Sequence, residues 1–460
     1  MHFAHAKILF KCLYGIMRSS NRIILLPKNQ KDQALKHKGT IKTNKADPSH
    51  HTIEPFLSAN PVLSSGSFLG GKTESPSLYD VSPPLITTSG RMAIALAIEN
   101  TGIGPGDQVL IPGYHCSSMV TPIINVSGIP VFYKIKPDMR VDLADIQSKI
   151  SKETKGLLVT HYFGITQPLS ELRSLCDEQG LILIEDCAHA FFGEVEGSVV
   201  GSYGDYAIGS LMKFFPVFDG GCLVSSKHSL EKLELSSGGK GFELQSLINL
   251  LEIAFKHRKL ILLKLLLFIP IAIKNNLWNW IKNTRKNKGK ITQTAPAASC
   301  GGIDFDPKWI HVRGSLATRV LMKLLSSKRI VNRRKENYHF LLQLFSNATH
   351  CRPLFETISD STVPYVFPLL VDNPDPIFYE LRAKGLPLLR WEQLWTGVDA
   401  TTCGISNHYS RHLIQIPCHQ EFTKADLEYM ATVIITGLSQ SAPASGDSEN
   451  TSTTNNKSGI

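Results

Sequence analysis

Residues 181–221 decide the fold, and they read LILIEDCAHAFFGEVEGSVVGSYGDYAIGSLMKFFPVFDGG. The stretch opens with a short apolar run that ends at two acids, Glu185 and Asp186. Such a run predicts a buried strand. Side chains alternate along a strand, so Glu185 is expected to point away from the face of Asp186 and to have a structural role. Further along, Lys213 stands in the apolar segment SLMKFF.

A carboxylate at the end of a buried strand and a lysine in apolar surroundings form the pair that pyridoxal phosphate needs. The lysine supplies the Schiff base, and the carboxylate keeps the pyridine nitrogen protonated, so that the ring acts as an electron sink. Taken singly, each residue has a simpler interpretation. A lysine in an apolar run usually extends its amine to water, and an aspartate after a strand usually caps a turn. The pair is therefore a hypothesis that the rest of the chain must support.

An anion site is predicted upstream, in TTSGRMAIALAIENTG. Ser89 and Gly90 precede an apolar helix, and small polar residues at a helix start leave backbone N–H groups at its positive end. Alone, this pattern is also that of an ordinary helix cap. The glycine-rich GIGPGD at 102–107 follows a helix and precedes a strand, the wrong order for a dinucleotide motif, so it predicts a turn.

Strand and helix patterns alternate from residue 108 to residue 225, which predicts an α/β fold with a mainly parallel central sheet and helices on both faces. Ligands of such sheets bind beyond the carboxyl ends of the strands. Asp186, His161 and the Ser89–Gly90 turn all fall at such ends. His161 has the alternative interpretation of a hydrogen-bonded histidine at a strand end.

The composition suits a globular protein, with 42% hydrophobic and 19% charged residues. Five regions follow from the patterns: a basic, poorly ordered extension at 1–75, a large cofactor-binding domain at 76–235, an apolar and basic helical insertion at 236–300, a C-terminal helix and small α+β domain at 301–438, and a disordered tail at 439–460. Nine cysteines occur without a CxxC pair, so no zinc or dithiol site is predicted. Their odd number fits a reducing cytoplasm. Lysines and arginines interrupt the apolar residues at the N-terminus, which argues against a signal peptide there.

The net charge is +10, and residues 227–290 hold thirteen Lys and Arg against four Asp and Glu. Two interpretations of this apolar and basic segment stay open. It forms helices packed on its own domain or on a partner subunit, or residues 250–290 lie on an anionic membrane with Trp278 and Trp280 at the interface. No aromatic residues are interleaved with the basic ones in the pattern of a nucleic-acid module, so nucleic-acid binding is not expected.

Taken in order, seven segments resemble the DegT-like sugar aminotransferase family, whose members are fold-type I pyridoxal-phosphate enzymes: SGRMAIAL, GIGPGDQVLIPGYHC, HYFG, LILIEDCAHAFFG, GSYGDYAIGSLMKFFPVFDGG, PYVFPLLV and IPCHQ. The resemblance covers residues 80–435 apart from 227–300, and the Ser-Leu-x-Lys context of the lysine is similar to a divergent branch. It implies a smaller C-terminal domain beside the cofactor domain.

The resemblance assigns roles by position. Lys213 aligns with the Schiff-base lysine that also shuttles a proton, and Asp186 aligns with the acid that pairs with the pyridinium nitrogen. His189 aligns with a residue that contacts the ring hydroxyl.

The phosphate is assigned to Gly90 and Arg91 at the helix start and to the hydroxyl of Ser210.

The chain also departs from the family pattern. Arg91 stands where the family usually has threonine, and Met212 stands where a hydroxyl residue is common. Cys116 occupies the position of the aromatic ring that stacks on the cofactor, so Tyr114 or His115 is the candidate replacement.

These features imply transfer of an amino group from an amino acid, with glutamate expected, to a keto sugar that is nucleotide-linked, in polysaccharide or lipopolysaccharide synthesis. The family also implies a homodimer with a phosphate ligand near Arg313 from the partner subunit, and no metal. Two alternatives remain: a dehydratase of the same fold, and a catalytically idle homologue that binds a partner or a membrane.

Overall fold

The computed structural model describes residues 57–265, 305–398 and 401–441. Its centre is a seven-stranded sheet in which β9 alone runs against the other strands. From one edge to the other the strands are β1 (Leu85–Thr87), β9 (Gly221–Val224), β8 (Tyr206–Ser210), β5 (Ile182–Asp186), β4 (Thr154–Thr160), β2 (Gln108–Pro112) and β3 (Ile129–Tyr133).

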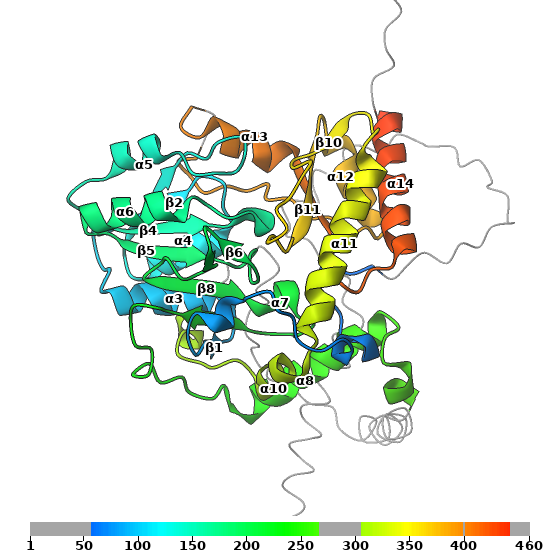
Figure 1. Ribbon diagram of the computed structural model, residues 1–460, viewed down its shortest axis with the longest axis horizontal. Coiled ribbons are helices and arrows are strands. Elements are labelled where there is room, and N and C mark those ends of the chain that lie inside the picture. The colour runs from blue at the N-terminus through cyan, green and yellow to red at the C-terminus, as the bar shows by residue number, and fades with distance from the viewer. Residues whose placement is uncertain (1–56, 266–304, 399–400, 442–460) are drawn as a thin grey trace, which may run out of the picture.

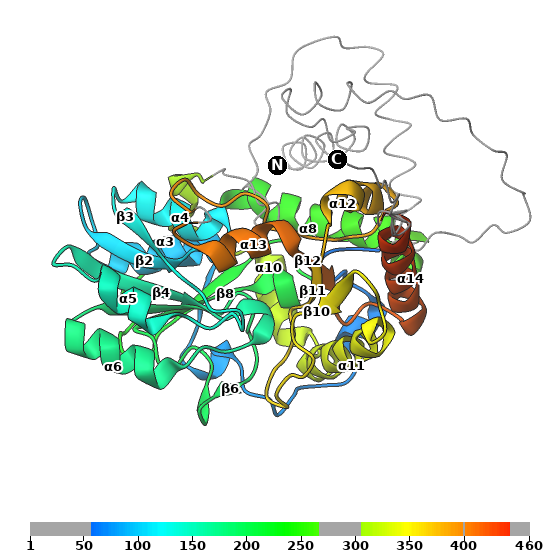
Figure 2. The ribbon, with the colours of Figure 1, turned by 90° about the horizontal axis from the view of Figure 1, so that it is seen from above.

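Helices cover both faces of this sheet (Figure 2). Alternate residues of a strand face opposite sides, and β2 shows the result: Val109 and Ile111 pack with one pair of helices, while Leu110 packs with the other. The first pair is α3 (Gly90–Thr101) and α4 (Ser117–Asn125), and the second pair is α5 (Leu143–Lys149) and α6 (Leu169–Gln179). The predicted doubly covered, mainly parallel sheet is confirmed.

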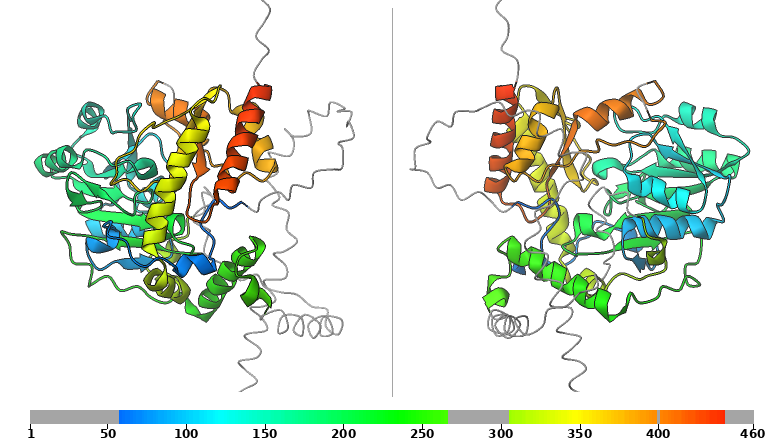
Figure 3. Two further views of the ribbon diagram at one scale, coloured as in Figure 1. Left: turned by 45° about the vertical axis from the view of Figure 1, so that its right-hand side comes forward. Right: turned by 180° about the vertical axis from the view of Figure 1, so that it is seen from behind.

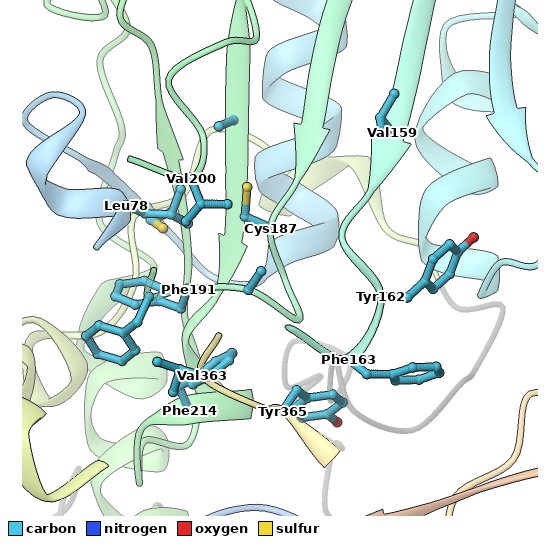
Figure 4. Packing of buried hydrophobic residues seen from close by; sticks show 14 of the residues in the cluster. Leu78, Val159, Tyr162, Phe163, Cys187, Phe191, Val200, Phe214, Val363 and Tyr365 are labelled. Carbon is cyan, nitrogen blue, oxygen red and sulfur yellow. The ribbon is translucent and has the colours of Figure 1, made fainter. Parts of the chain in front are cut away.

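A smaller domain follows, built on a three-stranded antiparallel sheet with its own apolar core (Figure 1). Its elements are β10 (Cys351–Pro353), β11 (Val366–Val371), β12 (Leu413–Pro417), α11 (Ser327–Phe345), α12 (Asp375–Ala383), α13 (Gly404–His412) and α14 (Lys424–Ser441). Val363 and Tyr365, just before β11, pack into the core of the large domain beside Phe163 and Phe214 (Figure 4).

The remaining described elements are short or peripheral. They are the β6 (Glu194–Val195) and β7 (Ser198–Val199) hairpin, α7 (Leu211–Phe214), α8 (Gly239–Lys256), α10 (Leu316–Leu324), and the 3-10 turns η1 (Ser65–Phe68), η2 (Leu78–Asp80), η3 (Tyr162–Gly164) and η4 (Pro307–Trp309). No helix in the described ranges is both long enough and apolar enough to cross a membrane.

Order begins earlier in the chain than the sequence indicates. Residues 57–75 lie within the expected disordered extension, yet Val62 and Leu63 are buried. Ser64 donates to the carboxylate of Glu421 at 2.8 Å, and His419 contacts the carbonyl of Ser58 at 3.0 Å. These partners lie more than 350 residues away in sequence, which is why local composition gives no sign of them. The expectations for 1–56, for 266–304 and for 442–460 lie outside the described residues.

Gly221 allows the strand β9 to reach the start of α3. A Cβ atom built on Gly221 would lie 2.3 Å from the carbonyl carbon of Ser89 and 2.5 Å from the nitrogen of Gly90. Both neighbours are backbone, so neither can move without displacing the helix start. Only glycine fits there, and the helix end is thereby held against the sheet.

We expect Gly221→Ala to lower the free energy of unfolding by about 3 kcal/mol or more, because the added methyl group would overlap backbone atoms. Chemical denaturation monitored by circular dichroism measures this. Gly241→Ala is the matched control, since nothing lies within 4 Å of its Cβ position. A Gly221→Ala protein as stable as the control would contradict the argument.

Candidate active site

A pocket lies where the parallel strands β4, β5 and β8 end, between the starts of α3, α4 and α7. The residues that line it come from all of these elements: Gly90, Arg91, Ile94, Cys116, Ser118, Met119, Thr160, Asp186, Ala188, His189, Ile208, Ser210 and Lys213. Six of the eight residues predicted for the site are therefore brought together by the fold.

The N-terminal end of α3 faces this pocket. Ser89 caps the helix, and its hydroxyl accepts a hydrogen bond from the Met92 N–H at 3.3 Å. Gly90 packs on the end of β8, because a Cβ atom there would lie 3.2 Å from the Cβ of Ser210. The positive end of the helix dipole, the buried Arg91 and Ser210 thus meet in one corner. Such a corner favours an anion.

Asp186 ends β5 at the base of the pocket and is buried. Its Oδ1 accepts a hydrogen bond from the Ala188 N–H at 2.9 Å. Burial raises the pKa of this carboxyl, while the charge of Lys213 and the Ala188 hydrogen bond oppose that rise. A cationic ligand group beside Asp186 would favour its ionised form.

Lys213 lies in α7, the single turn that follows β8. Burial lowers the pKa of its amine, against the opposing influence of Cys116 and Asp186. Its Nζ lies 5.3 Å from the centre of the Tyr365 ring. The lowered pKa increases the neutral fraction of the amine, which is the nucleophilic form.

Arg334 of α11 holds the backbone of Lys213 in place. Its Nη2 donates to the Lys213 carbonyl at 2.6 Å, and its Nη1 donates to the carbonyls of Pro364 and Tyr365 at 3.1 and 2.9 Å. Its Nε donates to Gln420 Oε1 at 3.1 Å. Burial lowers the pKa of Arg334 to about 10, so the guanidinium stays charged at neutral pH.

His189 is held between aromatic rings. Its ring stacks on Tyr365 at a centroid distance of 4.4 Å and on Phe163 at 5.6 Å. The Phe163 N–H donates to Nδ1 at 3.4 Å, and burial, with Lys213 nearby, lowers the pKa of the imidazole well below its usual value. His189 is thus neutral, and this hydrogen bond assigns its proton to Nε2.

The structure does not place His161 in this pocket. Its Nε2 lies 3.0 Å from Glu185 Oε2, and its Nδ1 accepts a hydrogen bond from the Gln167 N–H at 3.2 Å. Glu185 also accepts from the N–H groups of Gly201 and Gly204 at 3.0 and 2.6 Å. Strand alternation accounts for this: Glu185 and His161 meet on the face opposite Asp186. These contacts are those of a hydrogen-bonded histidine at a strand end.

Cys187 joins His161 and Glu185 in a group whose potential ligand atoms all lie within 4.8 Å of one another. The hydrogen bonds of His161 oppose metal binding. Because Nδ1 accepts from Gln167, the proton lies on Nε2, the atom that faces the group. Both oxygens of Glu185 are also already engaged.

Tyr114 is likewise outside the lining of the pocket. It is buried, and its ring contacts Trp391 and Tyr162 at centroid distances of 5.0 and 5.6 Å. Burial raises the pKa of its hydroxyl. At the position of the family's stacking ring, Cys116 itself lines the pocket, with its Sγ 2.8 Å from Ser118 Oγ.

His115, the other candidate for stacking, instead fixes a segment of the small domain. Its Nδ1 lies 2.9 Å from the Gly113 carbonyl, and its Nε2 accepts a hydrogen bond from the Trp395 N–H at 3.1 Å. The ring stacks on Phe132. Burial lowers the pKa of His115 to about 4.

Several pocket residues are absent from the sequence prediction. Thr160 ends β4 one position before His161, so the alternation that excludes His161 could have identified it. Ser118 and Met119 follow Cys116 in the first turn of α4. Arg334 and Tyr365, which contact Lys213 without lining the pocket, carry no such signal, since both come from distant parts of the chain. Arg313, expected near a partner's phosphate, donates its N–H to the Ser236 carbonyl at 2.9 Å.

The part of the chain that matches a known protein family contains all of the residues that line this pocket. Residues 80–244 match the DegT/DnrJ/EryC1/StrS aminotransferase family. The chain is 34% identical over 169 residues to GDP-perosamine synthase of Vibrio cholerae, covering 36% of this chain and 46% of that protein. It is 36% identical over 118 residues to L-glutamine:2-deoxy-scyllo-inosose aminotransferase of Streptomyces kanamyceticus, covering 25% and 28% respectively. The matches span less than half the length of these relatives. The predicted resemblance is confirmed over residues 80–244.

Solved structures share the fold over a longer part of the chain. Helicobacter pylori PseC, an aminotransferase involved in the biosynthesis of pseudoaminic acid, aligns with a TM-score of 0.55 at 14% identity, covering 84% of this chain and 100% of that one. The PLP form of Spr1654 from Streptococcus pneumoniae aligns with a TM-score of 0.53 at 15% identity, covering 81% and 93%. The expected fold-type I architecture is confirmed.

We expect acidification to destabilise the protein through His115. Its pKa is about 4 in the folded protein, against an ordinary value of 6.5. Below pH 6.5 the unfolded chain therefore binds more protons, so the free energy of unfolding falls as the pH drops toward 4. At pH 5 the loss from this residue is on the order of 2 kcal/mol. Denaturant titrations at pH 7 and pH 5 measure it. His115→Asn should show a smaller loss, while the exposed His339→Asn should behave as wild type; equal losses would refute the assignment.

Arg334→Lys should lower the free energy of unfolding by about 2–4 kcal/mol, because one ammonium cannot reach acceptors on four residues and leaves buried carbonyls unpaired. Thermal and denaturant unfolding test this. Arg382→Lys, an exposed arginine on α12, is the control and should change stability by less than about 0.5 kcal/mol. Similar stabilities of the two variants would show that the Arg334 hydrogen bonds do not stabilise the packing of the two domains against each other.

Proposed function

We propose that the protein is a pyridoxal-phosphate-dependent aminotransferase. The observation that carries the proposal is the buried Asp186 and the half-buried Lys213 in one pocket, with the helix start at Gly90 in the same pocket. The match of residues 80–244 to an aminotransferase family supports it, as does the fold shared with the PLP form of Spr1654.

The residues of the pocket fit this cofactor. The corner formed by Gly90, Arg91 and Ser210 suits the phosphate, and Asp186 suits a protonated ring nitrogen. The Nε2–H of His189 is available as a donor to the ring hydroxyl. When bound, the cofactor supplies an electron sink for charge that develops on the substrate carbon. Cys116, which also lines the pocket, would offer a bound ring no aromatic partner from that position.

The protein's own groups then account for the proton movements. The Lys213 amine, neutral in larger fraction because of burial, would hold the cofactor and afterwards take a proton from the substrate carbon and return it. Arg334 fixes the backbone from which Lys213 reaches. Asp186 would keep a proton on the ring nitrogen by its negative charge. The closely packed aromatic residues around His189 exclude water from one side.

For the substrates, we propose an amino acid donor and a keto sugar that is nucleotide-linked, for use in polysaccharide or lipopolysaccharide synthesis. The relatives named above support a sugar or cyclitol acceptor by their names. Glutamate is the proposed donor, and the glutamine in the name of the Streptomyces relative makes glutamine the alternative. A dehydratase would use the same lysine, so analysis of the products decides between the two reactions.

We further propose a homodimer in the cytoplasm. The amphipathic helix α10 exposes Leu316, Val320 and Leu324, an apolar face that a second subunit would cover. Ser315, which caps α10, donates its N–H and its hydroxyl to the carboxylate of Asp219, which follows the Lys213 segment. The seven cysteines among the described residues are all free thiols, as a reducing compartment favours.

Purified wild-type protein with pyridoxal phosphate should show an absorbance band in the visible range, and borohydride reduction should fix the cofactor on the peptide that contains Lys213. Lys213→Ala should lose the covalent form completely, while the exposed Lys232→Ala should retain it. Mass spectrometry of an incubation with glutamate and a panel of nucleotide-linked keto sugars should show the amino sugar. A wild-type protein that takes up no cofactor would contradict the proposal and favour the catalytically idle homologue.

A further inference from the structure

The end of α8 and the turn after it form an exposed surface that is both apolar and basic, which we name the α8 tip (residues 253–265). Five of the fourteen exposed large apolar side chains of the described residues lie in it: Ile253, Ile261, Leu262, Leu263 and Leu265. Leu262 and Leu265 are 78% and 61% exposed, values at which packing within the subunit contributes little. A group of exposed apolar side chains of this size is typical of a surface that binds a protein or a membrane.

The backbone presents these side chains outward. α8 is anchored by Leu250 and Ala254, which are buried. The helix ends in a turn where Arg258 and Leu260 adopt positive φ angles of 55° and 52°. A new helical turn begins at residue 261, closed by the Lys264 N–H donating to the Leu260 carbonyl at 2.9 Å. Figure 3 shows α8 along the lower edge of the molecule, away from the central sheet.

The charges of the α8 tip have one sign. Residues 253–265 contain four Lys and Arg and no Asp or Glu. Lys256, Arg258 and Lys264 are exposed, so cations precede the exposed leucines and stand among them. A subunit interface would have to bury these charges against acids. The interface of an anionic bilayer instead accepts both groups together, the leucines at the acyl boundary and the cations at the lipid phosphates.

We propose that the α8 tip is a membrane-docking surface, and that it binds the protein peripherally to a bilayer containing anionic lipids. The contact is reversible and depends on salt, because part of the attraction is between surface charges. It does not depend on the chemistry of the pocket, so it stands or falls independently of the proposed transamination.

Flotation of the full chain with vesicles tests the proposal. The protein should float with phosphatidylcholine vesicles that contain about 30% phosphatidylglycerol and remain behind with pure phosphatidylcholine, and about 0.5 M NaCl should release most of it. Leu262→Gln/Leu265→Gln and Lys256→Gln/Lys264→Gln should each weaken the partition about tenfold or more. All four positions are exposed, so both variants should unfold at the temperature of the wild type.

Matched controls separate the α8 tip from other exposed surfaces. Leu69→Gln/Ile129→Gln alters two exposed apolar side chains outside both the tip and α10, and Lys232→Gln/Lys240→Gln alters two exposed lysines outside the tip and α10. Both controls should partition as the wild type does. The proposal is overturned if the wild-type protein does not bind the anionic vesicles, or if the controls lose binding as strongly as the tip variants. Light scattering gives a further test: tip variants that become monomeric while still floating would identify a second copy as the occupant.

Discussion

The rest of the structure depends on the hydrogen bonds that the buried guanidinium of Arg334 donates. It is buried without a carboxylate among its hydrogen-bond partners in the described residues, and its acceptors are three backbone carbonyls and the amide oxygen of Gln420. It also lies over the Phe214 ring at 4.5 Å. A buried charge is tolerated when several dipoles converge on it. Here those dipoles belong to both domains, so the charge can be satisfied only when the domains are in place.

This arrangement links the geometry of the pocket to the packing of the small domain. Lys213 lies in a four-residue helix, too short to fix its own position. Its carbonyl is bound by Arg334 from α11, and the ring of Tyr365, which adjoins β11, lies close to its amine. The same Tyr365 ring stacks on His189 of the large domain. The lysine is therefore positioned by residues that fold with the other domain.

The parts of the site that the sequence predicts are those set by local periodicity. Asp186 and Gly90 meet because ends of neighbouring parallel strands and the helix starts beside them share one edge of the sheet, and Ser210, assigned by the family resemblance, ends β8 at the same edge. Successive side chains of a strand point to opposite faces of the sheet, which separates Asp186 from Glu185. His161 was predicted from its strand end and Tyr114 from its place in a motif, and the structure directs both side chains elsewhere. Periodicity does not predict contacts between distant parts of the chain. The hydrogen bond of Arg334 to the Lys213 carbonyl is one such contact. The contacts that order residues 57–75, with His419 and Glu421, are others.

The segment that carries the α8 tip leaves the pocket intact because its two ends, at Ser236 and at His311, are joined by backbone hydrogen bonds. Ser236 donates to the His311 carbonyl at 2.8 Å, and Arg313 donates to the Ser236 carbonyl at 2.9 Å, so the chain leaves and returns at one point. Beyond this closure, the Asp219 carboxylate binds the N–H and hydroxyl of Ser315 at 2.7 and 2.6 Å. The entropy of closing a loop grows only slowly with its length, so a long insertion at a fixed closure costs little stability. A new surface can therefore be added there without moving Lys213, and a pocket for small molecules and a docking surface can coexist in one chain.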